Sequence, residues 1–151
     1  MAAGQITVLD VALEKLTDGT FDLDNDAFNV VLLTDDQALT AAFVGTSGNA
    51  QYSDLTNETT GPGYTAEGEP LAGVQWTRAG SVVSLTATAT AWTALTAGMK
   101  YAVIIKNEAG TLTHILAYVD LETGDPAGRS SSGGDFVINW TGGLFTLTRA
   151  A

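Results

Sequence analysis

The sequence contains no cysteine, a single histidine and only six basic residues among 151. The absence of cysteine excludes disulfides, thiolate zinc sites and cysteine nucleophiles. No apolar run approaches the roughly 18 residues that a membrane-spanning helix needs, so we expect no membrane partner. The opening segment MAAGQITVLD lacks the basic start of a secretory signal peptide, so we expect a soluble protein made in a cytoplasm.

Positive charge is especially scarce in the first half of the chain. Residues 1–77 hold twelve acidic residues against one base, Lys15, whereas residues 78–151 hold five of each sign, so the net charge is −11. Phosphate backbones and anionic lipids bind positive surfaces, so this balance argues against nucleic acid and membrane as partners. The acidic half either keeps the protein in solution or faces a basic partner, and both interpretations stay open.

What the sequence does contain is a pattern of short strands behind one helix. A helix over about 5–17 is predicted by apolar residues at three- and four-residue spacing, namely Ile6, Leu9, Leu13 and Leu16. The apolar period then changes to two, which predicts strands at 28–34, 81–92, 100–106, 111–121, 135–140 and 144–148. Gly142 and Gly143 predict a tight hairpin between the last two strands.

This pattern predicts one mostly-β domain over residues 1–151, a β-sandwich or jelly roll with a single N-terminal helix. The unbroken apolar strands 28–34 and 100–106 are expected to be central and buried on both faces. Two segments rich in glycine, serine and threonine are expected to be loops: the long excursion 35–62 and the segment 124–135.

The segment FDLDNDAFNV, residues 21–30, begins as calcium loops do, with alternate aspartates at Asp22, Asp24 and Asp26. A helix–loop–helix calcium loop would need glycine at its sixth position and glutamate at its twelfth, where this chain has Ala27 and Leu33. We therefore expect no metal site, but a solvated turn from which Leu23 and Phe28 point inward.

No catalytic or cofactor-binding residue is predicted. His114 alone cannot build a multi-histidine zinc site, and no nucleophile elbow accompanies it, so we expect a hydrogen-bonded strand histidine. The glycine- and serine-rich segment 130–135 lacks the lysine of a phosphate loop. Three tryptophans could pack the core or form a carbohydrate platform, and we expect Trp140 to face inward with Phe136 on its strand; the three are Trp76, Trp92 and Trp140.

Five segments occur in an order that resembles a family of small virion proteins of tailed bacteriophages. They are ALEKLTDGTFDLDNDAFNVVLLT (12–34), GYTAEGEPL (63–71), TATAWTALTAGMKYAVII (88–105), LAYVDL (116–121) and SGGDFVINWTGGLFTL (132–147). No single segment is specific, and the order of all five carries the resemblance. The chain departs from the family's pattern where Glu67, Gly68 and Glu69 replace a pair of glycines, and in a slightly shorter last hairpin.

The resemblance implies a capsid decoration or cement protein, a β-sandwich module on the capsid exterior that is assembled in the host cytoplasm. It implies no enzymatic activity and no cofactor, and its implied partner is the major capsid protein. The open edge strands of a sandwich and the closed symmetry of homo-oligomers predict that copies of the protein also bind one another, as a dimer or trimer. A tail or head–tail adaptor part, or a carbohydrate-binding module of the virion, is the alternative. The candidate contact residues are Ile6, Leu9, Asp22, Asp24, Asp26, Phe43, Tyr52 and Tyr64.

Overall fold

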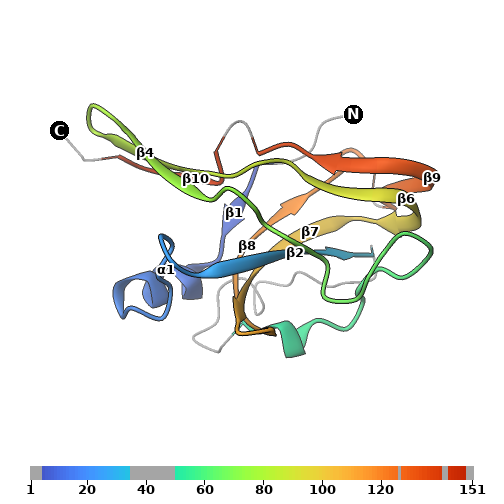
Figure 1. Cartoon of the computed structure of the whole chain (residues 1–151), viewed down its shortest axis with the longest axis horizontal. Coiled ribbons are helices and arrows are strands. Elements are labelled where there is room, and N and C mark those ends of the chain that lie inside the picture. Colours follow the sequence, from blue (N-terminus) through green and yellow to red (C-terminus); the bar gives the residue numbers. More distant parts are fainter. Residues whose placement is uncertain (1–4, 35–49, 126, 141–142, 149–151) are drawn as a thin grey trace.

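Two β layers enclose one hydrophobic core in the computed structural model of the chain, which describes residues 5–34, 50–125, 127–140 and 143–148 (Figure 1). The elements are β1 (Thr7–Val8), α1 (Asp10–Thr17), β2 (Ala27–Leu33), the 3-10 helix η1 (Tyr52–Asp54), β3 (Glu69–Pro70), β4 (Gln75–Ala79), β5 (Val82–Thr86), β6 (Thr90–Met99), β7 (Tyr101–Glu108), β8 (Thr111–Asp120), β9 (Arg129–Ile138) and β10 (Phe145–Thr148). The prediction of a mostly-β domain with one N-terminal α-helix is confirmed. Neither helix in these described ranges is long and apolar enough to cross a membrane.

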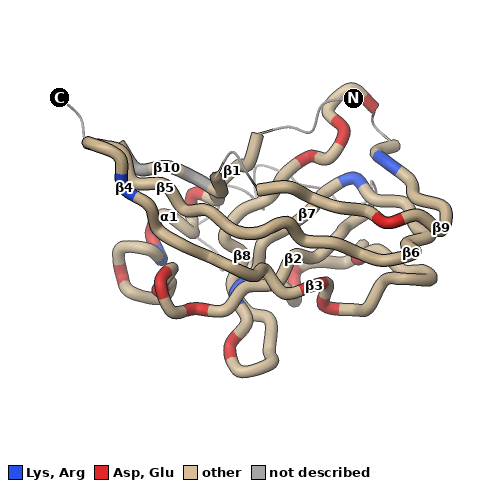
Figure 2. The backbone as a smooth tube through the Cα atoms, turned by 45° about the horizontal axis from the view of Figure 1, so that its top comes forward, with Lys and Arg blue, Asp and Glu red and all other residues tan. Residues whose placement is uncertain are grey.

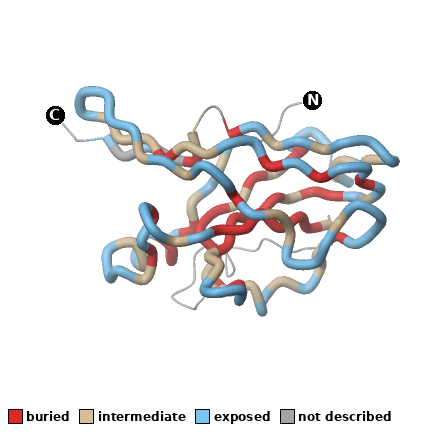
Figure 3. The backbone as a smooth tube through the Cα atoms, in the orientation of Figure 1, coloured by how far each residue is buried: buried red, intermediate tan, exposed pale blue. Residues whose placement is uncertain are grey.

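The first layer is an antiparallel five-stranded sheet in the order β1-β8-β7-β2-β3. Its two most apolar strands, β2 and β7, are neighbours near the middle, and residues 30–33 and 102–105 are at most 1% exposed. Strands buried on both faces need apolar side chains at every position, which is why these runs do not alternate. Figure 3 shows this buried centre. The predicted central position of both strands is confirmed.

The second layer consists of two smaller antiparallel sheets, β10-β5-β4 and β6-β9, which lie over the five-stranded sheet (Figure 1). Burial alternates along much of β6, so that Trp92, Leu95 and Met99 face the core while their neighbours face solvent. That alternation is typical of a strand with one buried and one solvated face. The chain crosses from this layer to the first at Lys100, between β6 and β7.

The prediction of one strand over 81–92 is wrong, because the chain leaves the ladder between β5 and β6. The backbone N–H of Thr88 donates to the carbonyl oxygen of Ala72 at 2.9 Å, which diverts residues 87–89 from the β4–β5 pairing. The predicted loop over 124–135 is also wrong in its second half. There β9 begins at Arg129, and its serine-rich start pairs with β6.

The predicted hairpin between the last two strands does not form. β10 pairs with β5 in the register Phe145↔Leu85, whereas β9 pairs with β6. The N–H of Leu144 donates to the carbonyl oxygen of Leu85 at 2.6 Å, which starts the new pairing before β10 begins. The edge of β5 therefore pairs with β10 in place of β9.

The predicted helix over 5–17 starts five residues late, at Asp10. The preceding Thr7–Val8 pairs with β8 instead, and the N–H of Leu9 donates to the carbonyl oxygen of Leu116 at 3.1 Å. β-Branched residues such as Thr and Val favour this extended pairing. Of the predicted excursion 35–62, residues 35–49 lie outside the described part. The remainder carries η1 and two isolated bridges, Glu58 to Leu33 of β2 and Gln51 to His114 of β8.

Candidate interaction site

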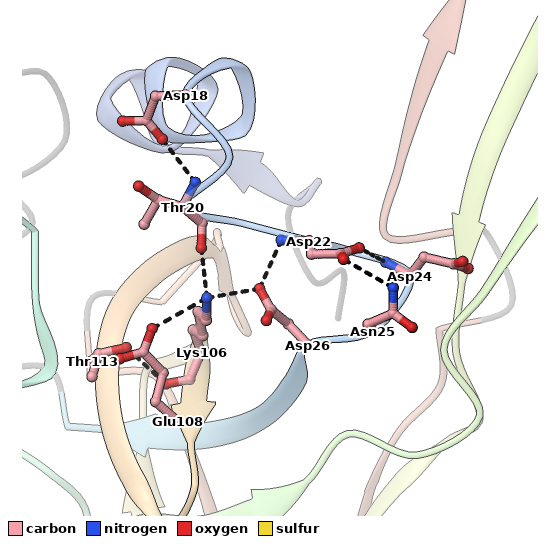
Figure 4. A network of polar contacts seen from close by, with 9 residues as sticks. All are labelled: Asp18, Thr20, Asp22, Asp24, Asn25, Asp26, Lys106, Glu108 and Thr113. Atoms are coloured by element: carbon pink, nitrogen blue, oxygen red, sulfur yellow. Dashed lines mark hydrogen bonds and ion pairs between the residues drawn. The ribbon is translucent and has the colours of Figure 1, made fainter.

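The aspartate-rich segment after α1 folds into a turn that its own side chains hold (Figure 4). The Asp22 carboxylate accepts hydrogen bonds from the N–H of Asp24 at 3.2 Å and from Asn25 Nδ2 at 2.9 Å. The Asp26 carboxylate accepts one from the N–H of Asp22 at 2.8 Å. Bonds of this kind make Asp and Asn favour turns over strands. The hydrogen bond from Asn25 holds the pKa of Asp22 below its ordinary value.

A lysine ammonium from β7 fills the inner side of this turn. Lys106 Nζ lies 3.0 Å from Asp26 Oδ2 and 3.2 Å from Glu108 Oε1, and it donates to the carbonyl oxygen of Thr20 at 2.5 Å. Burial acts to lower the pKa of Lys106, but the bonds to the two carboxylates outweigh it and raise that pKa. The carboxylate of Asp24 points away from this ammonium (Figure 4).

The geometry of the turn separates the carboxylates of its aspartates. Asp26 and Asp24 face opposite ways, and the protein's own cation binds the inward one. Leu23 and Phe28 are 6% and 2% exposed, which confirms that they point inward. Within the described ranges, no group of three or more His, Cys, Asp or Glu side chains is placed to hold a metal ion.

The outer side of the turn forms one wall of an open cavity of about 400 Å³. Asp22 and Asp24 are exposed, whereas Trp76 on β4 is half-buried. The sequence predicted contacts at both aspartates but did not join Trp76 to them, because β4 was missed. The pattern QWTRAGSVV, two short runs around Gly80, was the signal for the β4–β5 hairpin. The cavity is lined by Leu16, Gly19, Phe21, Asp22, Leu23, Asp24 and Trp76.

The two tyrosines predicted as partner contacts bind a glutamate of the same chain. Tyr52 donates to Glu58 Oε2 at 2.6 Å, and Tyr64 donates to Glu58 Oε1 at 2.7 Å. Burial and these hydrogen bonds raise the pKa of both tyrosines, so their hydroxyls stay protonated donors. Tyr64 also accepts from the N–H of Leu32 on β2 at 3.2 Å. The Tyr64 hydroxyl therefore joins this segment to β2, and the Tyr52 hydroxyl holds the Glu58 carboxylate within it.

Glu67, in the segment that joins the tyrosines to β3, has a strained backbone conformation. Glu67 has φ of 72°, in the left-handed region that favours glycine, and its N–H donates to Glu58 Oε1 at 2.7 Å. Gly68 follows with φ of 68°, and a Cβ there would lie 2.0 Å from the carbonyl oxygen of Val30. Glycine is thus required at this position, while Glu67 is held by the Glu58 carboxylate.

The remaining predicted contacts differ in their exposure. Leu9 is fully buried, so it is a core residue and not a surface contact. Ile6 is half-buried and packs against the same core, and Asp26 is engaged by Lys106. Phe43 lies outside the described residues.

The tryptophans do not form an exposed aromatic row. Trp92 and Trp140 are 1% and 3% exposed, and only Trp76 is half-buried. Trp140 Nε1 donates to Thr90 Oγ1 at 2.9 Å within the core. Phe136 lies 5.8 Å from Trp92 between ring centroids, so the predicted inward direction of Phe136 and Trp140 is confirmed.

Charged side chains are distributed unequally between the two layers (Figure 2). In the described parts of the second layer, residues 71–99 and 129–148, the charged residues are Arg78, Arg129 and Asp135. The exposed positions of β6 and β9 are mostly alanine, threonine, serine and glycine. Acidic residues lie mainly in the helix, the turns and the loops around the five-stranded sheet (Figure 2).

His114 on β8 packs against Phe21, the residue before Asp22, with ring centroids 6.2 Å apart and ring planes at 74°. Its Nδ1 is buried and has no hydrogen-bond partner among the described residues, so the expected hydrogen-bonded histidine is not found at that atom. Burial, with a smaller contribution from the positive charge of Lys15, lowers the pKa of His114 below its ordinary value.

We expect this histidine to make the fold less stable in acid. The unfolded chain binds a proton near the ordinary pKa of about 6.5, but the folded chain binds it only at lower pH. The histidine's contribution is therefore complete above that value and is lost as the pH falls through the lower, folded pKa. A proton NMR titration of the single histidine should give a pKa below about 6.5. A value at or above it would contradict the burial of the ring, and His114→Gln should flatten this part of the stability profile.

No family model, curated protein or solved structure matches the chain. The class that the fold and the site define is therefore a two-layered β protein with an acidic, tryptophan-containing cavity.

Proposed function

We propose that the protein is a structural component of a tailed-bacteriophage virion, and specifically a decoration or cement protein that binds the major capsid shell. The observation that carries the proposal is the order of the five sequence segments that resemble small virion proteins. In this role the protein has no catalytic activity and no cofactor, and it acts on the capsid exterior together with copies of itself.

The positions of the matching segments support this proposal. Segment 12–34 contains the aspartate turn and β2, and segment 88–105 contains the passage from β6 into β7 between the layers. Segment 132–147 contains most of β9 and the first part of β10. The resemblance therefore falls on the parts of the chain that define the architecture.

The use made of the ionisable side chains also supports a structural role. Lys106 joins β7 to the turn, Glu58 accepts from two tyrosines, and Lys100 binds the β8–β9 connection. Each of these groups is engaged with partners that hold the fold together. Exposed carboxylates on the helix and turns remain available to a basic partner surface.

The number of copies in a purified particle tests the proposal. A decoration protein should occur in a fixed ratio to the major capsid protein, which quantitative mass spectrometry of whole virions measures. About six or twelve copies, as one cyclic ring would give, would indicate a tail or adaptor part instead. Absence from particles produced by a host that expresses the protein would reject the virion assignment altogether.

The salt dependence of capsid binding tests which layer faces the shell. If the acidic first layer faces it, binding of the purified protein to undecorated capsids should weaken as salt screens the charges. Binding that is independent of salt would place the weakly charged second layer against the shell.

A further inference from the structure

The cavity between the aspartate turn and β4 is lined by apolar side chains and by acidic residues, so a ligand group that fills it must contact both. Leu16, Phe21 and Leu23 supply apolar walls, and Trp76 supplies an aromatic side chain from the other layer. Asp22 and Asp24 supply carboxylates at its exposed edge. The residues come from α1, the turn and β4, so that only the folded chain assembles them.

The carboxylates of this cavity form no ion pair with the described part of the chain. The ion pairs found within the described ranges involve Asp26, Glu108, Asp120 and Glu122, and none involves Asp22 or Asp24. Lys106, the cation bound to this turn, lies on its inner side with Asp26, while Asp24 points the other way (Figure 4). The negative charge at the cavity is therefore not neutralised by an ion pair of the turn.

The apolar walls select the kind of cation. A metal ion would require several oxygen ligands, whereas the Asp22 carboxylate already accepts two hydrogen bonds from its own turn. Arginine and lysine carry an apolar stem that packs on leucine and a charged head that favours a tryptophan face. Leu13, 48% exposed, lies one helical turn before Leu16 and extends the apolar surface beside the cavity.

We propose that this cavity binds an arginine or lysine side chain that a protein partner presents. The inference deepens the function proposed above, because it gives the chemistry of one partner contact, and its assignment of that partner to the virion rests on that function. The recognition itself belongs to the isolated chain. It is also a local reason why the acidic first layer would face a basic surface.

The test uses the isotope-labelled full chain and N-acetyl-arginine amide, with N-acetyl-citrulline amide as the neutral compound of nearly the same shape. NMR should show saturable shifts at the Trp76 indole N–H and at the amides of Asp22 and Asp24. The arginine compound should bind roughly three- to tenfold more tightly than the citrulline compound, a difference that salt should reduce. No shift, or equal binding of the two compounds, would overturn the proposal.

Two matched variants distinguish binding in the cavity from attraction by the overall negative charge of the protein. The side chain of Asp24 makes no hydrogen bond within the described residues, so Asp24→Asn should keep the fold and remove most of the preference for arginine. Glu67→Gln makes the same charge change at an exposed position outside the cavity and should keep the preference. If both variants behave alike, the attraction is diffuse and the pocket is not the site.

A neutral monosaccharide provides the last arm of this test. Saturable shifts of Trp76 with glucose that persist in Asp24→Asn would overturn the proposal in favour of a carbohydrate site. The particle copy number is an independent measurement. A failed titration would therefore leave the virion assignment standing, and absence from particles would leave the basic-side-chain pocket standing.

Discussion

Replacement of Trp140 by alanine should lower the free energy of unfolding by roughly 3–5 kcal/mol, the usual range for truncating a buried aromatic side chain. Trp140 is 3% exposed, and it follows β9 at the point where the chain turns toward β10. Its removal would leave a cavity in the hydrophobic core beside Thr90. The loss should appear as a lower midpoint in chemical denaturation with an unchanged slope.

A second substitution separates the packing of Trp140 from its hydrogen bond. Trp140→Phe keeps an aromatic ring but leaves the buried Thr90 hydroxyl without the indole donor that it accepts from at 2.9 Å. We expect a smaller loss of about 1–3 kcal/mol. Val137→Ala is the control, because Val137 is 46% exposed and should change stability by at most about 0.5 kcal/mol. A Trp140→Ala protein as stable as the control would show that this core assignment is wrong.

The strands that were predicted well are those whose signal is local. The runs that form β2, β7 and β8 are apolar or β-branched over enough residues to indicate a strand from the sequence alone. Their observed boundaries lie close to the predicted ones. The alternating stretch 81–92 also had a local signal. It was misassigned because Thr88 bonds to Ala72, a contact that pattern alone does not contain.

The local sequence pattern did not predict which strands pair with one another. Gly142 and Gly143 gave a hairpin signal, but the competing edge of β5 lies about sixty residues earlier in the chain. Closing a loop of that length costs roughly 2–3 kcal/mol more than closing a short one, since the cost rises with the logarithm of length, and contacts elsewhere in the fold can offset this difference. Side-chain pairing across the sheet then decides the partner of β10, and it depends on the whole fold.

In the candidate site, too, the features with a local sequence signal were predicted and those set by distant contacts were not. The turn at Asp22, Asp24 and Asp26 was predicted from residue type and spacing, and so was the inward direction of Leu23. The two residues that define the site's chemistry, Lys106 and Trp76, come from strands distant in the sequence. Their side chains meet the turn only because β7 pairs with β2 and because the second layer covers the first.

The second large effect should come from Lys100, the buried lysine where the chain crosses between the layers. Its Nζ donates to the carbonyl oxygens of Glu122 at 2.5 Å and Asp125 at 2.7 Å, and it lies 3.0 Å from Asp120 Oδ1. The β8–β9 connection approaches the β6–β7 crossing closely, since a Cβ on Gly128 would lie 2.5 Å from the Met99 carbonyl oxygen. The ammonium therefore holds the β8–β9 connection against the β6–β7 crossing.

We expect Lys100→Met to cost about 3 kcal/mol, at the lower end of the range for breaking a buried ion pair, because the partner carboxylate keeps some access to water. Methionine fills the space of the stem but removes the ammonium donor from the carbonyl oxygens of Glu122 and Asp125, each of which keeps one backbone N–H donor. Lys15→Met on α1 is the control and should change stability by less than about 1 kcal/mol.

Hydrogen exchange supplies the local measurement: the N–H of Leu121, bonded to the Lys100 carbonyl oxygen at 2.8 Å, should exchange faster in Lys100→Met. If its protection and the unfolding midpoint both equal those of the control, the connection is held by its backbone bonds, and the ammonium adds only charge.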